Sequence, residues 1–280
     1  MGDFKVKHDY AWKRPADISV KDAGAWKPVK TLYVNDAGVW KPVWVRPGAQ
    51  TFTASGTFTV PAGVYSICLA IISGGKPGVS GGSADSGGPG SGGAGGDGGT
   101  LAYKNSIAVT PGQTITVTIS AARRVDFGSY YVLPGLGGHS GNFDVVHLGG
   151  PGGAGQNRYY DFGYGFPGGA GGEAGFWGPV GSEGAGGQNA PGYPNNWAAQ
   201  GGAGTDLLGT KTTSAGSAQG GVRGQVYDGG NGATYGGGGG GGHGQSYGGG
   251  TGPTYGGVGG PGALRVIWGT GKSFPSAANF

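Results

Sequence analysis

The sequence predicts an all-β and irregular fold with essentially no α-helix. We expect a small module of β-hairpin repeats, then an antiparallel β platform and a sandwich of polyglycine II helices with aromatic-rich loops. Three observations predict this fold. Glycine supplies 74 of 280 residues and gathers in tracts. A 14-residue repeat of tryptophan and lysine occupies the first part of the chain. No window of 11 residues shows a convincing helical period of apolar side chains.

Several glycine tracts have a period of three. The registers comprise Gly75, Gly78 and Gly81, then Gly87, Gly90, Gly93, Gly96 and Gly99, then Gly172, Gly175, Gly178, Gly181, Gly184 and Gly187, and finally Gly256, Gly259 and Gly262. This period matches an extended helix with three residues per turn and no internal hydrogen bonds. Glycine in the row that faces a neighbour lets two backbones approach, so that their N–H and C=O groups bond sideways. The tracts therefore predict packed polyglycine helices over residues 74–262.

Two other structures fit a glycine-rich chain. A flexible linker is one, since glycine loses the most entropy on ordering. However, 11% aromatic and only 11% charged residues are the reverse of a disordered composition. A collagen triple helix would need an unbroken Gly-X-Y register with much proline, whereas these tracts are interrupted and the chain has 17 prolines.

The first domain, residues 1–48, contains the repeat. Val20–Val29 aligns with Val34–Val43, and a worn copy runs from Val6 to Lys13. Asp-Ala-Gly between two β-prone runs predicts a hairpin with glycine in the left-handed conformation. Each unit is too small to bury its own face, so the copies pack on each other around a tryptophan core or on a partner. The candidate attachment residues are Trp12, Trp26, Trp40, Trp44, Lys27 and Lys41.

The second domain, residues 49–280, begins after a predicted hinge at Pro47–Gln50. Its β platform covers residues 51–120, with strands expected at 51–53, 56–60, 64–70, 101–103, 106–109 and 114–119 and turns at 61–63 and 111–112. From about residue 121 we expect glycine tracts and loops until a closing strand at 263–268. The lone Cys68 excludes an intramolecular disulfide and lies in an apolar run, where a small buried side chain is expected.

Charge and hydropathy exclude some classes of partner. Residues 1–50 hold nine Lys or Arg and five Asp, which alternate with tryptophans, and the rest of the chain is balanced. This distribution predicts no nucleic-acid binding. No apolar stretch reaches the roughly 18 residues of a membrane span, and the first residues lack a signal-peptide core. We expect synthesis in a cytoplasm and no membrane insertion.

The sequence predicts no enzyme, no metal and no cofactor. Matches to G-x-G-x-x-G have almost no specificity at this glycine content, and no predicted helix follows them. Gly269–Ser273 resembles the end of a phosphate-binding loop, but valine occupies position 266, where that motif needs glycine. The four histidines lack metal-ligand spacing. A pair of carboxylates assembled by the fold into a glycan-cleaving site is the remaining enzymatic alternative.

Aromatic and arginine residues between the tracts are the candidate binding loops. Tyrosine, tryptophan and arginine give rigid contacts, and neighbouring Asn, Ser and Gly give adaptable hydrogen bonds. Some of these rings would instead cover the glycine bundle. The candidates are Arg123, Arg124, Phe127, Tyr130, Tyr131, Arg158, Tyr159, Tyr160, Phe162, Tyr164, Phe166, Trp177, Tyr193, Trp197, Tyr227, Tyr235, Tyr247 and Tyr255.

Three stretches carry a resemblance to a known family. Gly262–Ser276 resembles the C-terminal signature of glycine-rich bacteriophage tail-fibre proteins, and Phe58–Val64 and Val109–Gln113 also recur in such proteins. With aromatic loops between its glycine tracts, the chain is similar to tail-fibre tip adhesins of T-even-like phages. The resemblance implies a virion protein at the distal tip of a trimeric fibre. It would bind a host outer-membrane protein or surface glycan through loops on a polyglycine scaffold, and thus set host specificity.

Of two non-enzymatic alternatives, one stays open and the other is disfavoured. The chain could be the homotrimeric structural end of a fibre, which a native mass of three chains would indicate. A bundle of polyglycine helices with a flat ice-binding face would need regular Thr or Ala rows, and the outward positions are too irregular for that.

Overall fold

A computed structural model describes most of the chain apart from its aromatic-rich middle. The described residues are 6–8, 11–13, 18–82, 92–135, 138–154, 203–205, 211–215, 231–232, 235–240 and 254–275; for 6–8, 11–13, 203–205 and 211–215 only the backbone is described. Within these ranges every regular element is a β-strand and all strand pairs are antiparallel. The predicted all-β class is therefore confirmed for this part of the chain.

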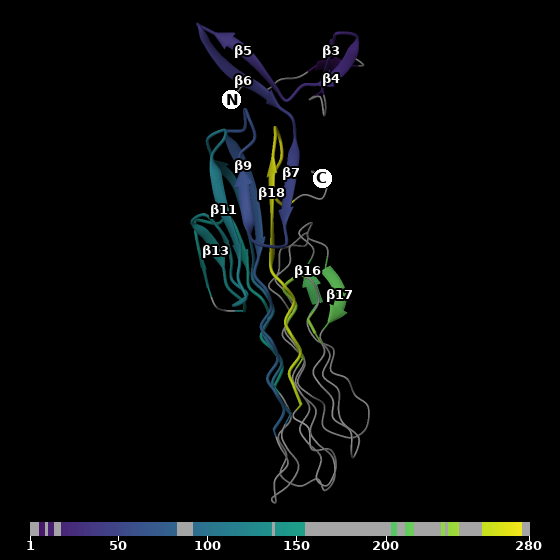
Figure 1. The fold of residues 1–280 in the computed structure, drawn as a ribbon, viewed down its shortest axis with the longest axis vertical. Helices are drawn as coiled ribbons and strands as arrows, with labels where there is room; N and C mark the ends of the chain where they lie inside the picture. Colours follow the sequence, from purple (N-terminus) through teal and green to yellow (C-terminus); the bar gives the residue numbers. More distant parts are fainter. Residues whose placement is uncertain are drawn as a thin grey trace, which may run out of the picture.

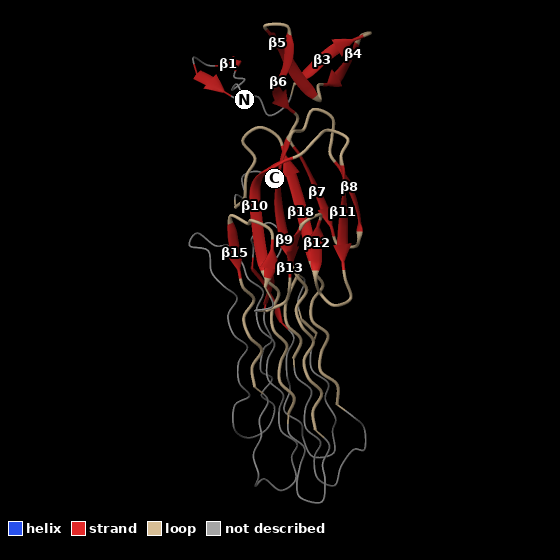
Figure 2. Ribbon diagram, turned by 90° about the vertical axis from the view of Figure 1, so that its left-hand side faces the viewer, coloured by secondary structure: helices blue, strands red, loops and turns tan. Residues whose placement is uncertain are grey.

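Three separate hairpins form the N-terminal region, at the end of the molecule away from the glycine segments (Figures 1 and 2). Their strands are β1 (Val6–His8) with β2 (Ala11–Lys13), β3 (Ser19–Asp22) with β4 (Ala25–Pro28), and β5 (Thr31–Asp36) with β6 (Val39–Val45). The predicted left-handed glycines are confirmed, with φ of 84° at Gly24 and 83° at Gly38. Ala23 and Ala37 also have positive φ, so these two turns have the type I′ geometry that matches the twist of a hairpin.

Two five-stranded antiparallel sheets form the centre of the molecule (Figure 2). The first sheet has the order β15-β10-β9-β18-β7 and the second the order β14-β13-β12-β11-β8. The strands of the first are β7 (Gly48–Phe52), β9 (Ser66–Ile72), β10 (Leu101–Ala108), β15 (Val145–His147) and β18 (Ala263–Trp268). Those of the second are β8 (Gly56–Thr59), β11 (Thr114–Ile119), β12 (Val125–Phe127), β13 (Tyr130–Val132) and β14 (His139–Ser140).

The main core lies between these sheets, with Leu69, Leu264 and Phe58 fully buried. A second apolar cluster covers the opposite face of the first sheet, where Ile72 and Ile267 pack with Phe274 of the C-terminal segment. The central strand β9 of the first sheet is therefore buried on both faces. This explains the nearly continuous apolar run in β9.

Three local predictions were wrong. The segment predicted as a hinge is the start of β7, which pairs along its length with β18. The region after residue 121 contains four strands of the sandwich, β12 to β15, rather than loops alone. The two strands expected at 101–103 and 106–109 are one strand with a bulge, where Ser106 has a φ of 57°. β7, β10 and β15 pair with strands far along the chain, whereas β12 to β14 pair with their neighbours in sequence. In each case strand pairing decided the conformation, and local propensity is only a weak guide to that.

Extended glycine segments run side by side away from the sandwich (Figures 1 and 2). Along residues 73–82 the N–H groups donate in turn to two neighbouring segments: Gly75 to Gly260, Lys76 to Asp97, Gly78 to Gly257 and Val79 to Ala94, over 2.7 to 2.9 Å. Residues 92–99 likewise bond to 148–154 and to 235–240, through Gly95 to Gly153, Gly98 to Gly150, Gly96 to Gly239 and Gly99 to Gly236. Donors to one neighbour thus recur at every third residue, whereas in a flat sheet they recur at every second residue, and Lys76 O also accepts from Gly239 N of a third segment.

The positions where only glycine fits recur at every third residue. A Cβ atom would lie within 2.1 Å of a neighbouring carbonyl oxygen at Gly93, Gly96 and Gly99, and within 2.0 Å of one at Gly256 and Gly259. Two of the predicted registers therefore correspond to close contacts between backbones. The Gly172–Gly187 register lies outside the described residues. Beside the glycine segments, β16 (Ala203–Thr205) pairs with β17 (Lys211–Ala215).

Candidate binding surfaces

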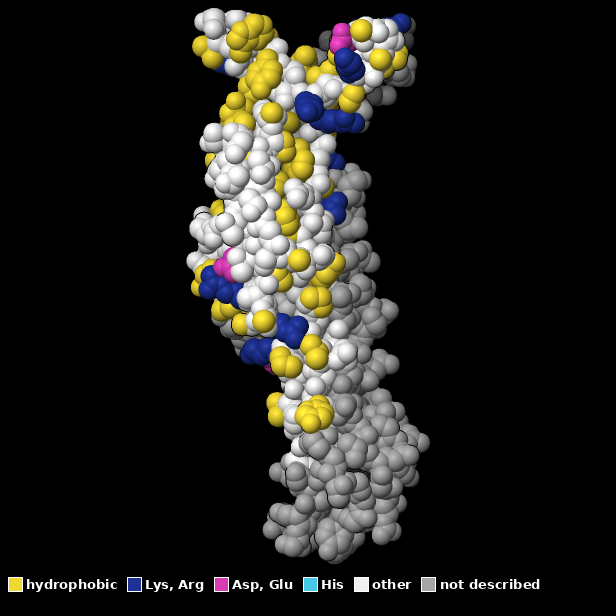
Figure 3. All heavy atoms as spheres, viewed as in Figure 1, with side chains coloured by type: hydrophobic (Ala, Val, Ile, Leu, Met, Phe, Trp, Pro, Cys, Tyr) yellow, Lys and Arg dark blue, Asp and Glu magenta, His cyan; other side chains and the backbone are white. Residues whose placement is uncertain are grey.

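Exposed apolar side chains concentrate on the second and third hairpins. Trp26 is 72% exposed and Trp40 66% exposed, and Val20, Tyr33, Val34 and Val39 are also more than 40% exposed. Figure 3 shows hydrophobic side chains at this end of the molecule. An isolated two-stranded hairpin is at best marginally stable in water. The tryptophans therefore do not form a core within the described chain, and they are free to contact a partner.

Each face of these hairpins carries its own set of residues. Cross-strand partners share a face, so Trp26 lies with Lys21, and Val20 lies with Lys27 on the other side. The third hairpin repeats this arrangement, with Trp40 beside Asn35 on one face and Val34 beside Lys41 on the other. Apolar side chains are therefore exposed on both faces of each hairpin. In a strand with one buried face, apolar and polar residues alternate along the sequence. These hairpins lack that alternation, which is the signal that could have identified Val20, Tyr33, Val34 and Val39 as exposed.

Both predicted attachment lysines form ion pairs within their own hairpins. Lys27 Nζ lies 2.5 Å from Asp22 Oδ2, and Lys41 Nζ lies 2.6 Å from Asp36 Oδ2. These side chains are more than half exposed, so each pair contributes little to stability. The repeated geometry shows that the two hairpins are structural copies as well as sequence copies.

The remaining attachment residues differ from these. Trp44 is only 2% exposed, because the base of β6 enters the sandwich while its tip stays in solvent. It anchors the hairpin and is unavailable to a partner, which corrects its predicted role. Trp12 lies in β2, for which only the backbone is described.

The sandwich contains five of the predicted loop residues. Phe127 is 1% exposed and belongs to the main core, so its predicted role in binding is wrong. The Arg123 guanidinium donates to Gly259 O over 2.7 Å, which ties the second sheet to a glycine segment. Arg124 lies over the Tyr131 ring, 3.8 Å from its centroid, and also pairs with Asp126. The hydrogen bond from Arg124 to that carboxylate raises the pKa of Arg124 above its ordinary value.

An aromatic cluster forms around Phe143. Tyr130 packs edge-on against Phe143 with ring centroids 5.4 Å apart, and His139 packs against the same phenylalanine at 5.9 Å. Gly141 makes room for the cluster, since a Cβ there would lie 2.4 Å from the Tyr130 ring. His139 is exposed and was not among the predicted residues. Tyr130 is partly buried against the core.

The glycine segments carry two more predicted residues. Tyr255 is 59% exposed, in the same row of a period-three segment as Val258, which is 52% exposed. Tyr235 instead packs against the second apolar cluster. The other candidates lie outside the described residues: Arg158, Tyr159, Tyr160, Phe162, Tyr164, Phe166, Trp177, Tyr193, Trp197, Tyr227 and Tyr247.

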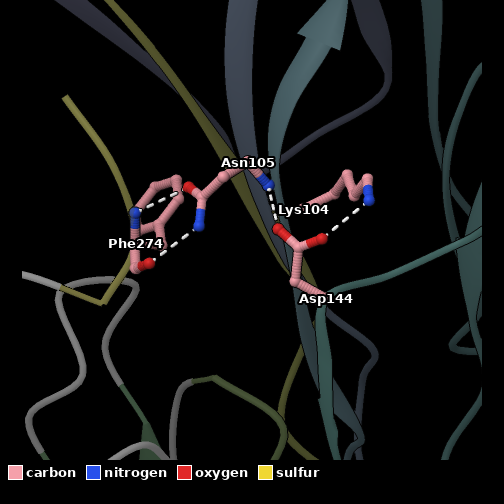
Figure 4. Close-up of polar contacts among 4 residues, drawn as sticks. All are labelled: Lys104, Asn105, Asp144 and Phe274. Atoms are coloured by element: carbon pink, nitrogen blue, oxygen red, sulfur yellow. Dashed lines mark hydrogen bonds and ion pairs between the residues drawn. The ribbon is translucent and has the colours of Figure 1, made fainter. Parts of the chain in front are cut away.

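A polar cluster holds the C-terminal segment against the bulge of β10 (Figure 4). The Asn105 side chain donates to Phe274 O and accepts from Phe274 N, both over 2.8 Å. The Asp144 carboxylate accepts from the backbone N–H of Asn105 over 2.7 Å and from Lys104 Nζ over 2.6 Å. Desolvation raises the pKa of Asp144, but the hydrogen bonds from Lys104 and Asn105 outweigh it, so the pKa is below its ordinary value. The hydrogen-bonding groups of the cluster are paired with one another, which assigns the cluster a structural role.

The same segment covers the single cysteine. Cys68 is 6% exposed, as predicted, and its thiol donates to Lys272 O over 3.3 Å. Burial raises the pKa of Cys68 above its ordinary value. A protonated, covered thiol is a poor nucleophile and a poor metal ligand.

Among the residues that the structure describes, no group of three or more His, Cys, Asp or Glu side chains is placed to hold a metal ion. No helix that is long and apolar enough to span a membrane occurs in the described ranges. No protein-family model matches the chain, and no curated protein matches it either. Interpretation of function therefore depends on the surfaces described above.

Proposed function

We propose that this chain is an adhesin at the distal tip of a bacteriophage tail fibre. In this proposal the N-terminal hairpins attach to a trimeric fibre, and loops carried by the glycine segments bind a protein or glycan on the host surface. The observation that carries the proposal is the separation of two features along the molecule. Exposed tryptophans lie at one end, and laterally bonded glycine segments extend from the opposite end of the sandwich (Figure 1).

We infer further that the glycine segments form a bundle of polyglycine II helices. A three-residue period brings N–H groups to two or more neighbours in turn, in agreement with the bonds of Gly75, Lys76, Gly78 and Val79. Close contacts at Gly93, Gly96 and Gly99 agree with one glycine row per helix facing a neighbour. Such a bundle bonds in more than one direction, so it is stiff without an apolar core. A stiff scaffold that displays loops is the usual division between support and recognition.

The hairpins support the attachment half of the proposal. They display apolar rings that the described chain leaves uncovered, and large exposed apolar patches commonly mark protein–protein contacts. The polar clusters of the described residues are satisfied internally, and nothing in them favours catalysis over binding.

Competition for adsorption tests the proposal. The purified chain, added before infection, should slow adsorption of the parent phage on a sensitive host and leave an unrelated phage unaffected. Host mutants that lack single surface proteins or glycans should then separate into those that bind the chain and those that do not. If the chain binds none of the hosts that adsorb the phage, the adhesin proposal is contradicted. A native mass of three chains would favour the homotrimeric fibre end.

A further inference from the structure

The N-terminal hairpins have strand edges that pair with no other strand of the described chain. Each is a two-stranded sheet of its own, without pairing to the sandwich or to another hairpin. In Figures 1 and 2 the second and third hairpins diverge from each other at the end of the molecule. A strand edge is a row of N–H and C=O groups that can pair with another chain.

The two edges of each hairpin are unequal. Beyond a two-residue turn, the first cross-strand pair of residues is hydrogen-bonded, and non-hydrogen-bonded and hydrogen-bonded pairs then alternate. We call the non-hydrogen-bonded pairs wide; their N–H and C=O groups point away from the partner strand. Pro28 pairs with Ser19 and Pro42 pairs with Tyr33, both at the wide positions where N–H groups point outward. The bond from Val29 N to Ile18 O, at 2.7 Å, confirms this alternation in the second hairpin. Proline therefore removes an outward donor from β4 and from β6.

The first strand of each hairpin keeps its outward donors. The sequences of β3 and β5 contain no proline, and their wide positions direct the N–H groups of Ser19, Lys21, Tyr33 and Asn35 away from the hairpin. Proline on an exposed edge prevents unwanted pairing in native sheets. In both hairpins proline lies on the second strand, so the first strand is the edge that keeps all its outward donors.

Charge indicates the kind of strand that these edges fit. Residues 18–46 contain five Lys or Arg and two Asp. Both aspartates already pair with lysines of the same hairpin, Asp22 with Lys27 and Asp36 with Lys41. The surface is therefore basic, which favours an acidic partner. A second copy would bring the same positive charge to the interface.

We infer that the β3 and β5 edges each accept an extended strand, flanked by carboxylates, from the fibre chain to which the hairpins attach. The added strand pairs its backbone with the outward N–H and C=O groups of β3 or β5, and the sheet grows from two strands to three. The widened sheet gives Trp26 and Trp40 a larger apolar surface against which to pack. This inference rests on the proposed attachment to a fibre, and it specifies the mode of that attachment.

Amide hydrogen exchange of the full-length chain tests the inference, with the purified C-terminal portion of the fibre trimer from the same phage as probe. Exchange at Ser19, Lys21, Tyr33 and Asn35 should slow by at least about tenfold on binding. The outward amides of Trp26 and Trp40, on the proline-bearing strands, are internal controls and should slow much less. Binding with equal protection of both edges, or with none on β3 and β5, would overturn the inference but leave the attachment intact.

Paired substitutions give a second, independent measurement. Lys21→Pro with Tyr33→Pro removes two outward donors, and Lys21→Ala with Tyr33→Ala removes the same side chains but keeps the donors. The proline variant should bind the fibre trimer about tenfold or more weakly than the alanine variant. Equal affinities would contradict edge pairing.

Two further outcomes are separable from these. Protection of the same edges in the chain alone, rising with its concentration, would assign them to a second copy and overturn the inference. No binding of the wild-type chain to the fibre trimer would refute the proposed attachment itself.

Discussion

Replacing Gly96 with alanine tests whether the glycine segments are packed backbone to backbone. In the structure the new Cβ would lie 2.1 Å from Lys76 O and 2.5 Å from Pro77 O, whereas contacts of real Cβ atoms begin at about 3.0 Å. Both oxygens belong to backbone, so no rotamer change relieves the overlap. Segments 73–82 and 92–99 must therefore separate by about 1 Å.

The cost follows from the bonds that join these segments. Lys76 N donates to Asp97 O over 2.7 Å and Val79 N donates to Ala94 O over 2.8 Å. Lys76, Val79 and Ala94 are exposed, so each weakened hydrogen bond costs about 0.5–1.5 kcal/mol. Alanine recovers about 0.4–1 kcal/mol by restricting the unfolded chain. The net loss is then about 1–2 kcal/mol, or roughly 2 to 8 °C in thermal midpoint.

Thermal and urea unfolding of the full-length chain measure this loss. Ala94→Ser is the matched control, because Ala94 is exposed on the same segment and the change adds one atom on its outward side. The control should shift stability by less than about 0.5 kcal/mol. If Gly96→Ala and Ala94→Ser unfold at the same midpoint, the segments are not packed at this spacing and the reasoning is refuted.

Three other predictions concern the hairpins and the C-terminal clasp. Ala37, with a φ of 49°, occupies a left-handed position that asparagine tolerates better, so Ala37→Asn should stabilise the third hairpin by about 0.5–1 kcal/mol. Slower exchange of the Val39 amide would confirm this, and Ala25→Asn, on a strand, should give no gain. Trp44→Ala should destabilise the chain by about 3–5 kcal/mol because Trp44 is 2% exposed, whereas Trp26→Ala should change stability by less than about 0.5 kcal/mol. Similar unfolding midpoints for the two variants would contradict the assignment of Trp44 to the buried base of the hairpin. The pKa of Asp144 is lowered in the folded chain, so its carboxylate stabilises the fold above the ordinary value of 3.8, and this contribution is lost as pH falls through the lowered pKa. Asp144→Asn should therefore unfold more easily than wild type at neutral pH, with a gap that closes in acid; a gap independent of pH would count against this role.

Short-range patterns in the sequence identified much of the local structure. The strands β8, β9, β11 and β18 were predicted from β-prone runs between turn residues, and the left-handed Gly24 and Gly38 from the Asp-Ala-Gly turns. The registers at Gly93–Gly99 and Gly256–Gly262 also came from spacing alone. These features depend on a few neighbouring residues, so their signal is contained in the order of the chain.

Exposure of the candidate residues was predicted less well. Phe127, Tyr130 and Arg123 lie in one aromatic and basic stretch that gives no indication of which side chain points inward. Only the pairing of β12 with β11 and β13 directs Phe127 into the core, while Arg123 reaches a glycine segment 136 residues further along the chain. Likewise, two tryptophans of one hairpin differ in burial: Trp44 lies at its buried base and Trp40 near its exposed tip.

The sequence by itself determined where strands, turns and glycine rows occur, because sterics and side-chain periodicity act over a few residues. The tertiary structure decided that two sheets face each other, that the predicted hinge segment is an edge strand of one sheet and that Trp26 and Trp40 stay exposed. Those outcomes depend on contacts between residues far apart in the chain. Burial is a property of the assembled layers, and no single segment specifies it.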